Sequence, residues 1–208
     1  MKSVLLCALR VMLLAVAAFS TGAFAQSVEF GMVKPGTYQI EPYHTQVVFS
    51  VSHFGFTNFS GIFAGASGTL QLNPAQLGES KLDLSIAVQS ITTTVSILTQ
   101  ELKGEQWLDV AKFPTATFVS RKIVRTGSAS ARVTGDLTLH GVTRPEVLDV
   151  RLVGAGSNPL SKAYTVGFEA TGTIRRGDFG IKMDLPAVGD DVALRIAGAF
   201  EAKKNSGG

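Results

Sequence analysis

Short segments in which apolar and polar residues alternate recur along most of this 208-residue chain. Between residues 81 and 89, Leu82, Leu84 and Ile86 share one face of an extended segment, while Asp83 and Ser85 share the other. The same alternation returns in 131–139 and 192–201. A sheet with one apolar face must cover that face, and about eight such strands can do so by closing on themselves. The sequence therefore predicts an all-β protein built as a closed antiparallel barrel.

Turn residues and changes of period divide the chain into elements. The expected strands are 37–40, 46–53, 61–72, 81–89, 116–123, 131–139, 146–153, 164–174 and 192–201. Between 94 and 110 the apolar residues Val95, Leu98 and Leu102 recur at helical spacing, with Thr94 as the expected N-cap. We expect one or two short helices here, covering an end of the barrel. The Gly-, Asp- and Pro-rich stretch 175–191 is expected to form a long loop.

The first 25 residues have the pattern of a removable signal peptide. Lys2 and Arg10 precede or flank an apolar stretch, and Ala23-Phe24-Ala25 supplies the small residues that signal peptidase requires. No later segment is apolar over the ~18 residues that a membrane span needs. We therefore expect a periplasmic or secreted protein, cleaved near Ala25. The expected domains are the leader 1–25, a flexible arm 26–35, a barrel 36–202 and a disordered tail 203–208.

Charge and cysteine content exclude several classes of function. The formal charge of +3 falls to +1 when Lys2 and Arg10 are removed with the leader. A nearly neutral domain lacks the basic stripe that nucleic acid binding requires. The single cysteine, Cys7, lies in the leader, so the mature domain is expected to contain neither a disulfide nor a thiol nucleophile.

Four ordered blocks resemble the YceI-like polyisoprenoid-binding family. They are "YHTQVVFSVSHFGFTNFSGIFAGASGTL" (43–70), "SITTTVSILTQELKGEQWLDVAKFPTATFVS" (90–120), "GDLTLHGVTRP" (135–145) and "IRRGDFGI" (174–181). The resemblance covers about residues 37 to 202. It implies a lipocalin-like barrel that binds a long isoprenoid, such as a polyprenyl phosphate or a quinone tail, and no other cofactor. Trp107 departs from the family pattern, which commonly has Phe at this position.

The inward apolar face and three polar residues are the candidate ligand-binding set. The apolar pattern on its own favours a solid core, and the resemblance is what favours a ligand. His53 closes a strand and is expected at the barrel mouth, while Arg176 and Asp178 match the family's Arg-x-Asp-Phe-Gly block, either as headgroup contacts or as an ion pair that fixes the loop. The predicted set is Val47, Phe49, Val51, His53, Leu82, Leu84, Ile86, Val88, Phe118, Leu137, Leu139, Phe168, Arg176, Asp178, Leu194 and Ile196.

Three functions remain in competition at this level. The first is a non-enzymatic carrier of a lipid-like molecule, in which the helical segment and the loop 175–191 gate the cavity. The second is an enzyme acting on a lipid or quinone substrate with His53 as general base, although no nucleophile or metal set accompanies that histidine. The third is a structural or interaction module with a solid core. The sequence leaves a homodimer and transient membrane contact open, and it predicts neither catalytic residues nor a metal site.

Overall fold

The computed structural model describes residues 28–203, and the predicted leader lies outside them. The strands are β1 (Gly36–His53), β2 (Thr57–Phe63), β3 (Ala66–Leu72), β4 (Lys81–Ala87), β5 (Thr92–Thr93), β6 (Thr115–Arg125), β7 (Ser130–Leu139), β8 (Val142–Ser157), β9 (Tyr164–Arg175) and β10 (Val188–Ala202). One α-helix, α1 (Ser96–Lys103), is joined by four 3-10 helices: η1 (Phe30–Met32), η2 (Leu77–Glu79), η3 (Val88–Ser90) and η4 (Arg176–Phe179).

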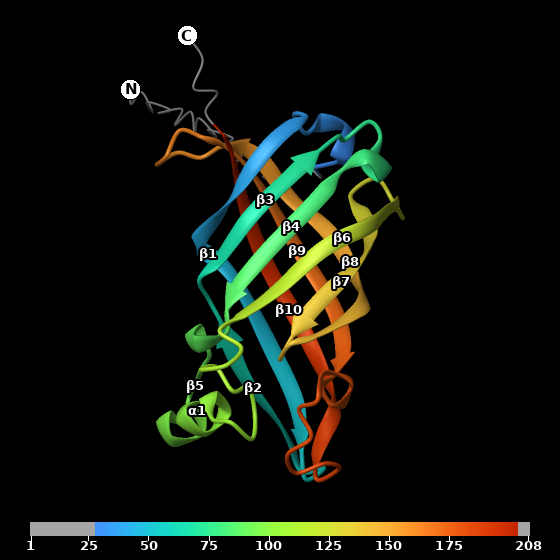
Figure 1. The fold of residues 1–208 in the computed structure, drawn as a ribbon. Coiled ribbons are helices and arrows are strands. Elements are labelled where there is room, and N and C mark those ends of the chain that lie inside the picture. The colour runs from blue at the N-terminus through green and yellow to red at the C-terminus, as the bar shows by residue number, and fades with distance from the viewer. Residues whose placement is uncertain (1–27, 204–208) are drawn as a thin grey trace, which may run out of the picture.

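The strands form a closed antiparallel barrel (Figure 1). Its order is β10-β9-β8-β7-β6-β4-β3-β1, and pairing of β1 with β10 closes the ring of eight strands. The upper half of β1 pairs with β3, while its lower half pairs with β2, which in turn carries the short β5. The predicted barrel of about eight strands with short helices is confirmed. We call the end at which β1 begins and β10 ends the upper end, and the end with α1 the lower end (Figure 1).

Local turn chemistry explains how neighbouring strands connect. His140 and Gly141 join β7 to β8 with φ of 52° and 75°. A two-residue hairpin with positive φ at both positions matches the right-handed twist of its strands. Gly65, at φ 66°, separates β2 from β3, where the sequence predicted one strand over 61–72. None of the helices within residues 28–203 is long and apolar enough to cross a membrane.

The helical segment differs from the prediction in its N-cap. Helix α1 begins at Ser96, and its N-cap is Val95, which makes no side-chain cap bond. The expected cap, Thr94, is therefore wrong. The hydroxyl that forms hydrogen bonds at the start of α1 belongs to Thr93. Its Oγ1 accepts the Val95 N–H at 3.2 Å and lies 2.9 Å from Oγ1 of Thr99.

The segment before β1 packs on the barrel, in contrast to the predicted flexible arm. Phe30 and Val33 are only 2% and 5% exposed, and the Phe30 N–H donates to the Ser128 carbonyl at 3.0 Å. The Tyr38 hydroxyl donates to the Lys34 carbonyl at 2.5 Å. Burial, aided by nearby Tyr164, raises the pKa of Tyr38 to about 12. This segment therefore plugs the upper end.

Truncating this plug is expected to destabilise the barrel. Phe30→Ala removes a buried aromatic ring and leaves a cavity, which typically costs ~3–5 kcal/mol. Met32→Ala is the matched control, because Met32 is 55% exposed and a surface change of this kind stays within ~0.5 kcal/mol. Urea unfolding of both variants measures the difference, and equal losses would contradict a plug formed by Phe30.

Candidate ligand-binding site

Two cavities lie inside the barrel. Cavity 1 has a volume of about 210 Å³ and lies toward the lower end, with Phe49, Trp107 and Ile181 among its walls. Cavity 2 has a volume of about 110 Å³ and includes Phe30 of the upper plug in its lining. Five residues line both cavities, so the two adjoin: Ile40, Thr45, Leu84, Leu148 and Ile196.

The walls of both cavities are apolar. Among residues 28–203, the surface that faces either cavity carries no polar atom, so the polar lining residues contribute carbon atoms to it: Thr45, Ser80, Thr117, Glu146 and Arg176. A buried water needs two to four polar partners, and apolar cavities remain dry or take up apolar guests. The interior is therefore suited to hydrocarbon.

The volumes of the two cavities indicate how much stability the fold would gain if a guest filled them. At ~24 cal/mol per Å³, a void of about 210 Å³ costs roughly 5 kcal/mol and one of about 110 Å³ roughly 3 kcal/mol. A whole domain is stable by only ~5–15 kcal/mol. A guest that fills the cavities would thus contribute a large share of the stability of the fold.

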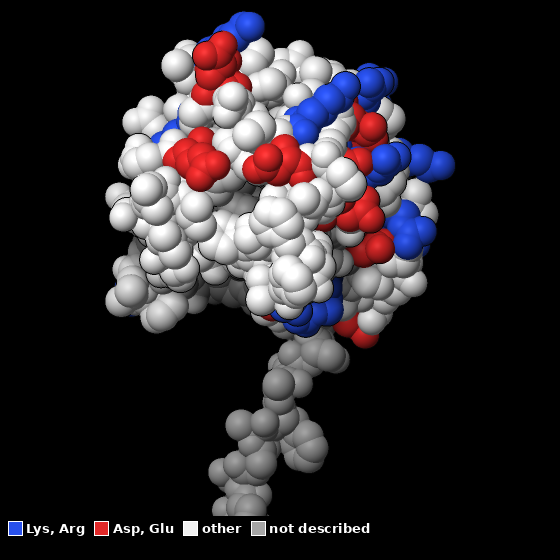
Figure 2. All heavy atoms as spheres, turned by 90° about the horizontal axis from the view of Figure 1, so that it is seen from below, with Lys and Arg blue, Asp and Glu red and all other residues white. Residues whose placement is uncertain are grey.

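Side chains close both ends of the barrel. At the upper end Phe30 and Tyr38 are nearly fully buried. At the lower end a second cluster closes the base, with Val88, Ile91 and Phe179 at 1%, 1% and 0% exposure. Seen from below, much of the lower surface is uncharged, and charged side chains lie mainly toward one side (Figure 2).

Fourteen of the sixteen predicted residues line a cavity. Cavity 1 is lined by Val47, Phe49, Val51, Leu84, Ile86, Val88, Phe118, Leu137, Leu139, Arg176, Leu194 and Ile196. Cavity 2 takes in Leu82 and Phe168 and shares Leu84 and Ile196. Strand alternation thus brought these residues together, and their role as ligand contacts stays a prediction.

His53 and Asp178 lie outside both linings. The register of β1 shifts between Val51 and His53, so the inward alternation stops before His53, which is exposed with its ring centroid 4.4 Å from that of Phe54. Asp178 is exposed on η4. His53 thus ends β1 outside both linings, and its role as a headgroup contact at the barrel mouth stays a prediction.

The sequence missed the lining residues that come from loops and from α1. These are Ile91, Leu102, Trp107, Leu108 and Ile181. Strand alternation carries no signal for such residues, because their orientation depends on how a connection folds back over the barrel. The helical spacing through Leu102 and the departure at Trp107 were the only sequence signals in this region.

Arg176 is buried and fixes the loop after β9. Its Nε, Nη1 and Nη2 donate to the backbone carbonyls of Gly189, Ile181 and Val188 at 2.8, 3.0 and 2.7 Å. Burial lowers the pKa of Arg176, partly opposed by the nearby charges of Asp190 and Asp184. Within the described chain, no carboxylate lies within salt-bridge distance of it. The predicted ion pair with Asp178 is therefore wrong, and backbone carbonyls hold the loop instead.

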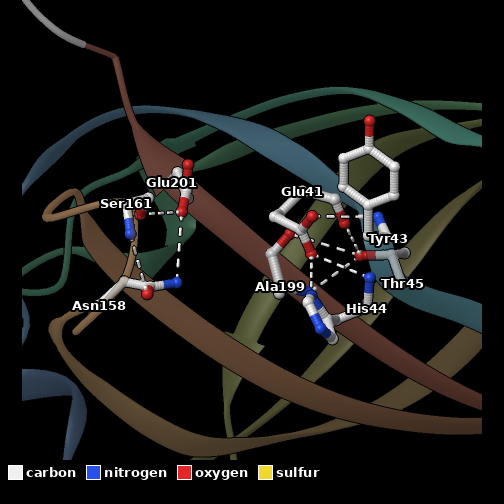
Figure 3. Close-up of polar contacts among 8 residues, drawn as sticks. All are labelled: Glu41, Tyr43, His44, Thr45, Asn158, Ser161, Ala199 and Glu201. Atoms are coloured by element: carbon white, nitrogen blue, oxygen red, sulfur yellow. Dashed lines mark hydrogen bonds and ion pairs between the residues drawn. The ribbon is translucent and has the colours of Figure 1, made fainter.

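A polar cluster closes an irregularity in β1 (Figure 3). The β1–β10 register shifts between Glu41 and Gln46, and the Thr45 hydroxyl bridges the excursion by donating to the Glu41 carbonyl at 2.7 Å and accepting the Ala199 N–H at 3.1 Å. Burial alone would raise the pKa of Glu41, but hydrogen bonds from His44 and from the Tyr43 and His44 amides lower it overall. His44 therefore stabilises this turn through its hydrogen bonds to the Glu41 carboxylate.

A second contact in Figure 3 ties a loop to the barrel. Ser161 Oγ donates to Glu201 Oε1 at 2.5 Å, and the Asn158 amide donates to the same oxygen at 3.4 Å. The β8–β9 connection is thereby fastened to β10 at the upper end.

Comparison with known proteins identifies relatives over most of the chain. The YceI-like domain family matches residues 38–200. The UPF0312 protein of Pseudomonas savastanoi pv. phaseolicola is 36% identical over 166 residues, covering 80% of this chain and 86% of that protein. A UPF0312 protein of Pectobacterium atrosepticum is 33% identical over 185 residues, covering 89% and 92%.

Solved structures share the fold. BcnA of Burkholderia cenocepacia superimposes with a TM-score of 0.69 at 22% identity, covering 77% of this chain and 98% of that one. The YceI protein of Campylobacter jejuni gives 0.63 at 27% identity, covering 74% and 90%. A polyisoprenoid binding domain from Saccharophagus degradans gives 0.58 at 16% identity, covering 82% and 100%. With its family match, its relatives and its closed barrel, this chain belongs to the YceI-like domain family.

Proposed function

We propose that this protein binds a long-chain, hydrocarbon-tailed molecule of the polyisoprenoid class and carries it without chemical change. The observation that supports this most directly is the pair of adjoining cavities with wholly apolar walls. The tail lies in cavities 1 and 2, and any headgroup lies outside them, because the walls offer it no hydrogen-bond partner. The proposal includes export to the periplasm or beyond, which rests on the leader pattern of residues 1–25.

The energetics favour a tail as the main determinant of binding. Burying one methylene is worth ~0.8 kcal/mol, so ten methylenes carry a gross ~8 kcal/mol before the costs of ordering the chain. Polar headgroup contacts are not needed to reach useful affinity. The S. degradans domain, which is described as polyisoprenoid binding, supports the choice of ligand class.

The arrangement of polar residues supports a carrier over an enzyme. Within residues 28–203, the two linings contain one carboxylate, Glu146, and no histidine or cysteine, and the surface that faces the cavities is formed by carbon atoms. Arg176, the one cationic residue of the cavity 1 lining, is committed to three backbone carbonyls. His53, the general base of the competing enzyme hypothesis, lies outside the linings.

The test is organic extraction and mass spectrometry of freshly purified protein. We expect a stoichiometric long-chain amphiphile, recovered chemically intact after incubation. Recovery of a cleaved or oxidised product that forms with time would instead favour the enzyme hypothesis. An extract without amphiphile, from protein that also fails to take up added solanesol, would favour a solid-core module and overturn the carrier proposal.

Removing the ligand is expected to lower thermal stability. A ligand present at ~100 times its Kd stabilises the native state by about 2.7 kcal/mol. For a domain of this size each kcal/mol shifts Tm by ~2–4 °C, so extraction should lower Tm by roughly 5–11 °C. Differential scanning fluorimetry before extraction, after it and after reloading with solanesol measures the shift. An unchanged Tm in all three states would contradict occupancy of the cavities.

A further inference from the structure

The ladder between β8 and β9 stops before either strand ends. Their pairing begins at Asp149 and Thr171 and runs upward to Ser157 and Tyr164. Below that first pair, β8 continues down to Val142 along β7, and β9 continues to Arg175 along β10. Within the described chain, these lower portions, 142–148 and 172–175, make no ladder with each other, and at the top of the stretch Gly172 lies against the Val147 carbonyl and the Leu148 side chain. We call this unpaired stretch the seam.

The seam borders directly on cavity 1. Leu148 and the carbon stem of Glu146 line the cavity from the β8 side, and Ile174 lines it from the β9 side. Glu146 is half-buried, and burial together with the charge of Asp178 raises its pKa. A hydrocarbon chain that passed between these strands would therefore reach the cavity without crossing either closed end.

The segment η4, which follows β9 directly, contacts β8 and the β7–β8 turn at the lower end of the seam. On η4, the Asp178 carbonyl accepts a bond from Arg144 Nε at 3.4 Å, and the Phe179 carbonyl lies 3.1 Å from His140 Nδ1. The Arg144 bond is longer than the usual range of about 2.7–3.2 Å, whereas the His140 distance lies within it. The side chain of Phe179 is fully buried in the lower cluster.

Two other interruptions of the barrel ladder are fastened more tightly. The excursion in β1 is bridged by Thr45, with its bond to Glu41 at 2.7 Å. The upper part of β6, beyond its last pair with β4, is held by Arg125 donating to the Pro74 carbonyl at 2.7 Å and by the Leu82 N–H donating to Ser120 Oγ at 2.8 Å. The shorter of these bonds fasten both places more tightly than the contact between η4 and Arg144 of β8, whereas Arg176 anchors η4 on the β10 side.

We propose that the seam is the entrance site for a single hydrocarbon chain, which passes between β8 and β9 into cavity 1 when the η4 segment moves aside. This rests on the proposed function, since it concerns the route of the same ligand. Because both ends of the barrel are closed, a ligand needs another route. The apolar rim formed by Leu148 and Ile174 suits a hydrocarbon tail that carries no charged groups along its length.

Cross-linking across the seam tests the route. In a Cys7→Ser background the described residues contain no cysteine, so Arg144→Cys and Asp178→Cys can be joined by a short bis-methanethiosulfonate reagent and released by dithiothreitol. The matched control joins Asp149→Cys to Thr171→Cys, the first laddered pair of the same two strands. The readout is the rate at which extracted protein takes up pyrenyl hexadecanol, followed by fluorescence.

We expect the seam cross-link to slow uptake by about tenfold or more, which corresponds to a barrier raised by ~1.4 kcal/mol. Dithiothreitol should restore the rate, and the control cross-link should leave it unchanged. Equal rates in all forms, or equal slowing by both cross-links, would overturn the seam as the entrance while leaving the carrier function intact. Failure of the uncross-linked protein to bind the probe at all would overturn both.

Discussion

Leu148→Trp is expected to remove binding of long chains while sparing short ones. Leu148 lines both cavities, so a larger ring at this position separates cavity 1 from cavity 2. A tail that spans both would lose its upper portion, and excluding about four methylenes costs ~3 kcal/mol at ~0.8 kcal/mol each. That corresponds to a loss of more than a hundredfold in affinity. Titration with solanesol and with the much shorter farnesol measures the two effects.

The neighbouring residue supplies the control. Val147 points outward on the same strand and is 45% exposed, so Val147→Trp should leave both affinities unchanged. The free energy of unfolding of the extracted Leu148→Trp protein is a second measurement that distinguishes a solid core from a cavity. Overpacking a solid core costs ~1–3 kcal/mol, whereas an existing cavity accepts the ring at little cost. A large loss of stability with unchanged solanesol binding would contradict a through-going cavity.

Alternation predicted which strand residues face inward, because the two-residue period of a strand is independent of tertiary context. Leu84 and Ile86 lie in the wall of cavity 1 for that reason. The same period could not reveal whether the centre is hollow. A packed barrel and a hollow one present identical patterns, since the volume left inside depends on how all the side chains fit together.

The sequence could not place residues outside the period, and the predicted set also left out some strand residues, such as Phe63 and Ile174. Phe30 precedes the first strand in a stretch without periodicity, and its burial depends on the open end of the barrel that it covers. The lower part of β8 escaped prediction because Thr143, Arg144 and Pro145 are exposed and break the apolar pattern. The role of Arg176 depends on three carbonyls from a loop that shows no regular pattern.

Arg176→Met is expected to destabilise the loop after β9 strongly. The substitution keeps an unbranched side chain but removes all three donors from the carbonyls of Gly189, Ile181 and Val188. Hydrogen bonds from a charged donor contribute ~1.5–3 kcal/mol each, and buried acceptors left without a partner carry a further cost. Relief of the buried charge offsets part of this, as the lowered pKa of Arg176 indicates.

We therefore expect a net loss of about 3 kcal/mol, seen as a Tm lower by roughly 6–12 °C for a domain of this size. Because the loop carries Ile181, which lines cavity 1, and adjoins η4 at the seam, release of a bound pyrenyl hexadecanol should also become faster. Thermal unfolding and stopped-flow release measure these two effects independently.

The preceding arginine is the control for that experiment. Arg175 is exposed and pairs with Asp190 at 2.9 Å, an arrangement on the surface that contributes only ~0–1 kcal/mol. Arg175→Met removes the same charge one residue away, so it should change Tm little and leave release unaffected. If Arg175→Met and Arg176→Met lowered Tm equally, the positive charge of Arg176 would account for its stabilising effect. The three hydrogen bonds to carbonyls would then contribute nothing beyond that charge. If Arg176→Met lowers Tm and speeds release much more than Arg175→Met does, the buried guanidinium of Arg176 is what keeps the lower end closed.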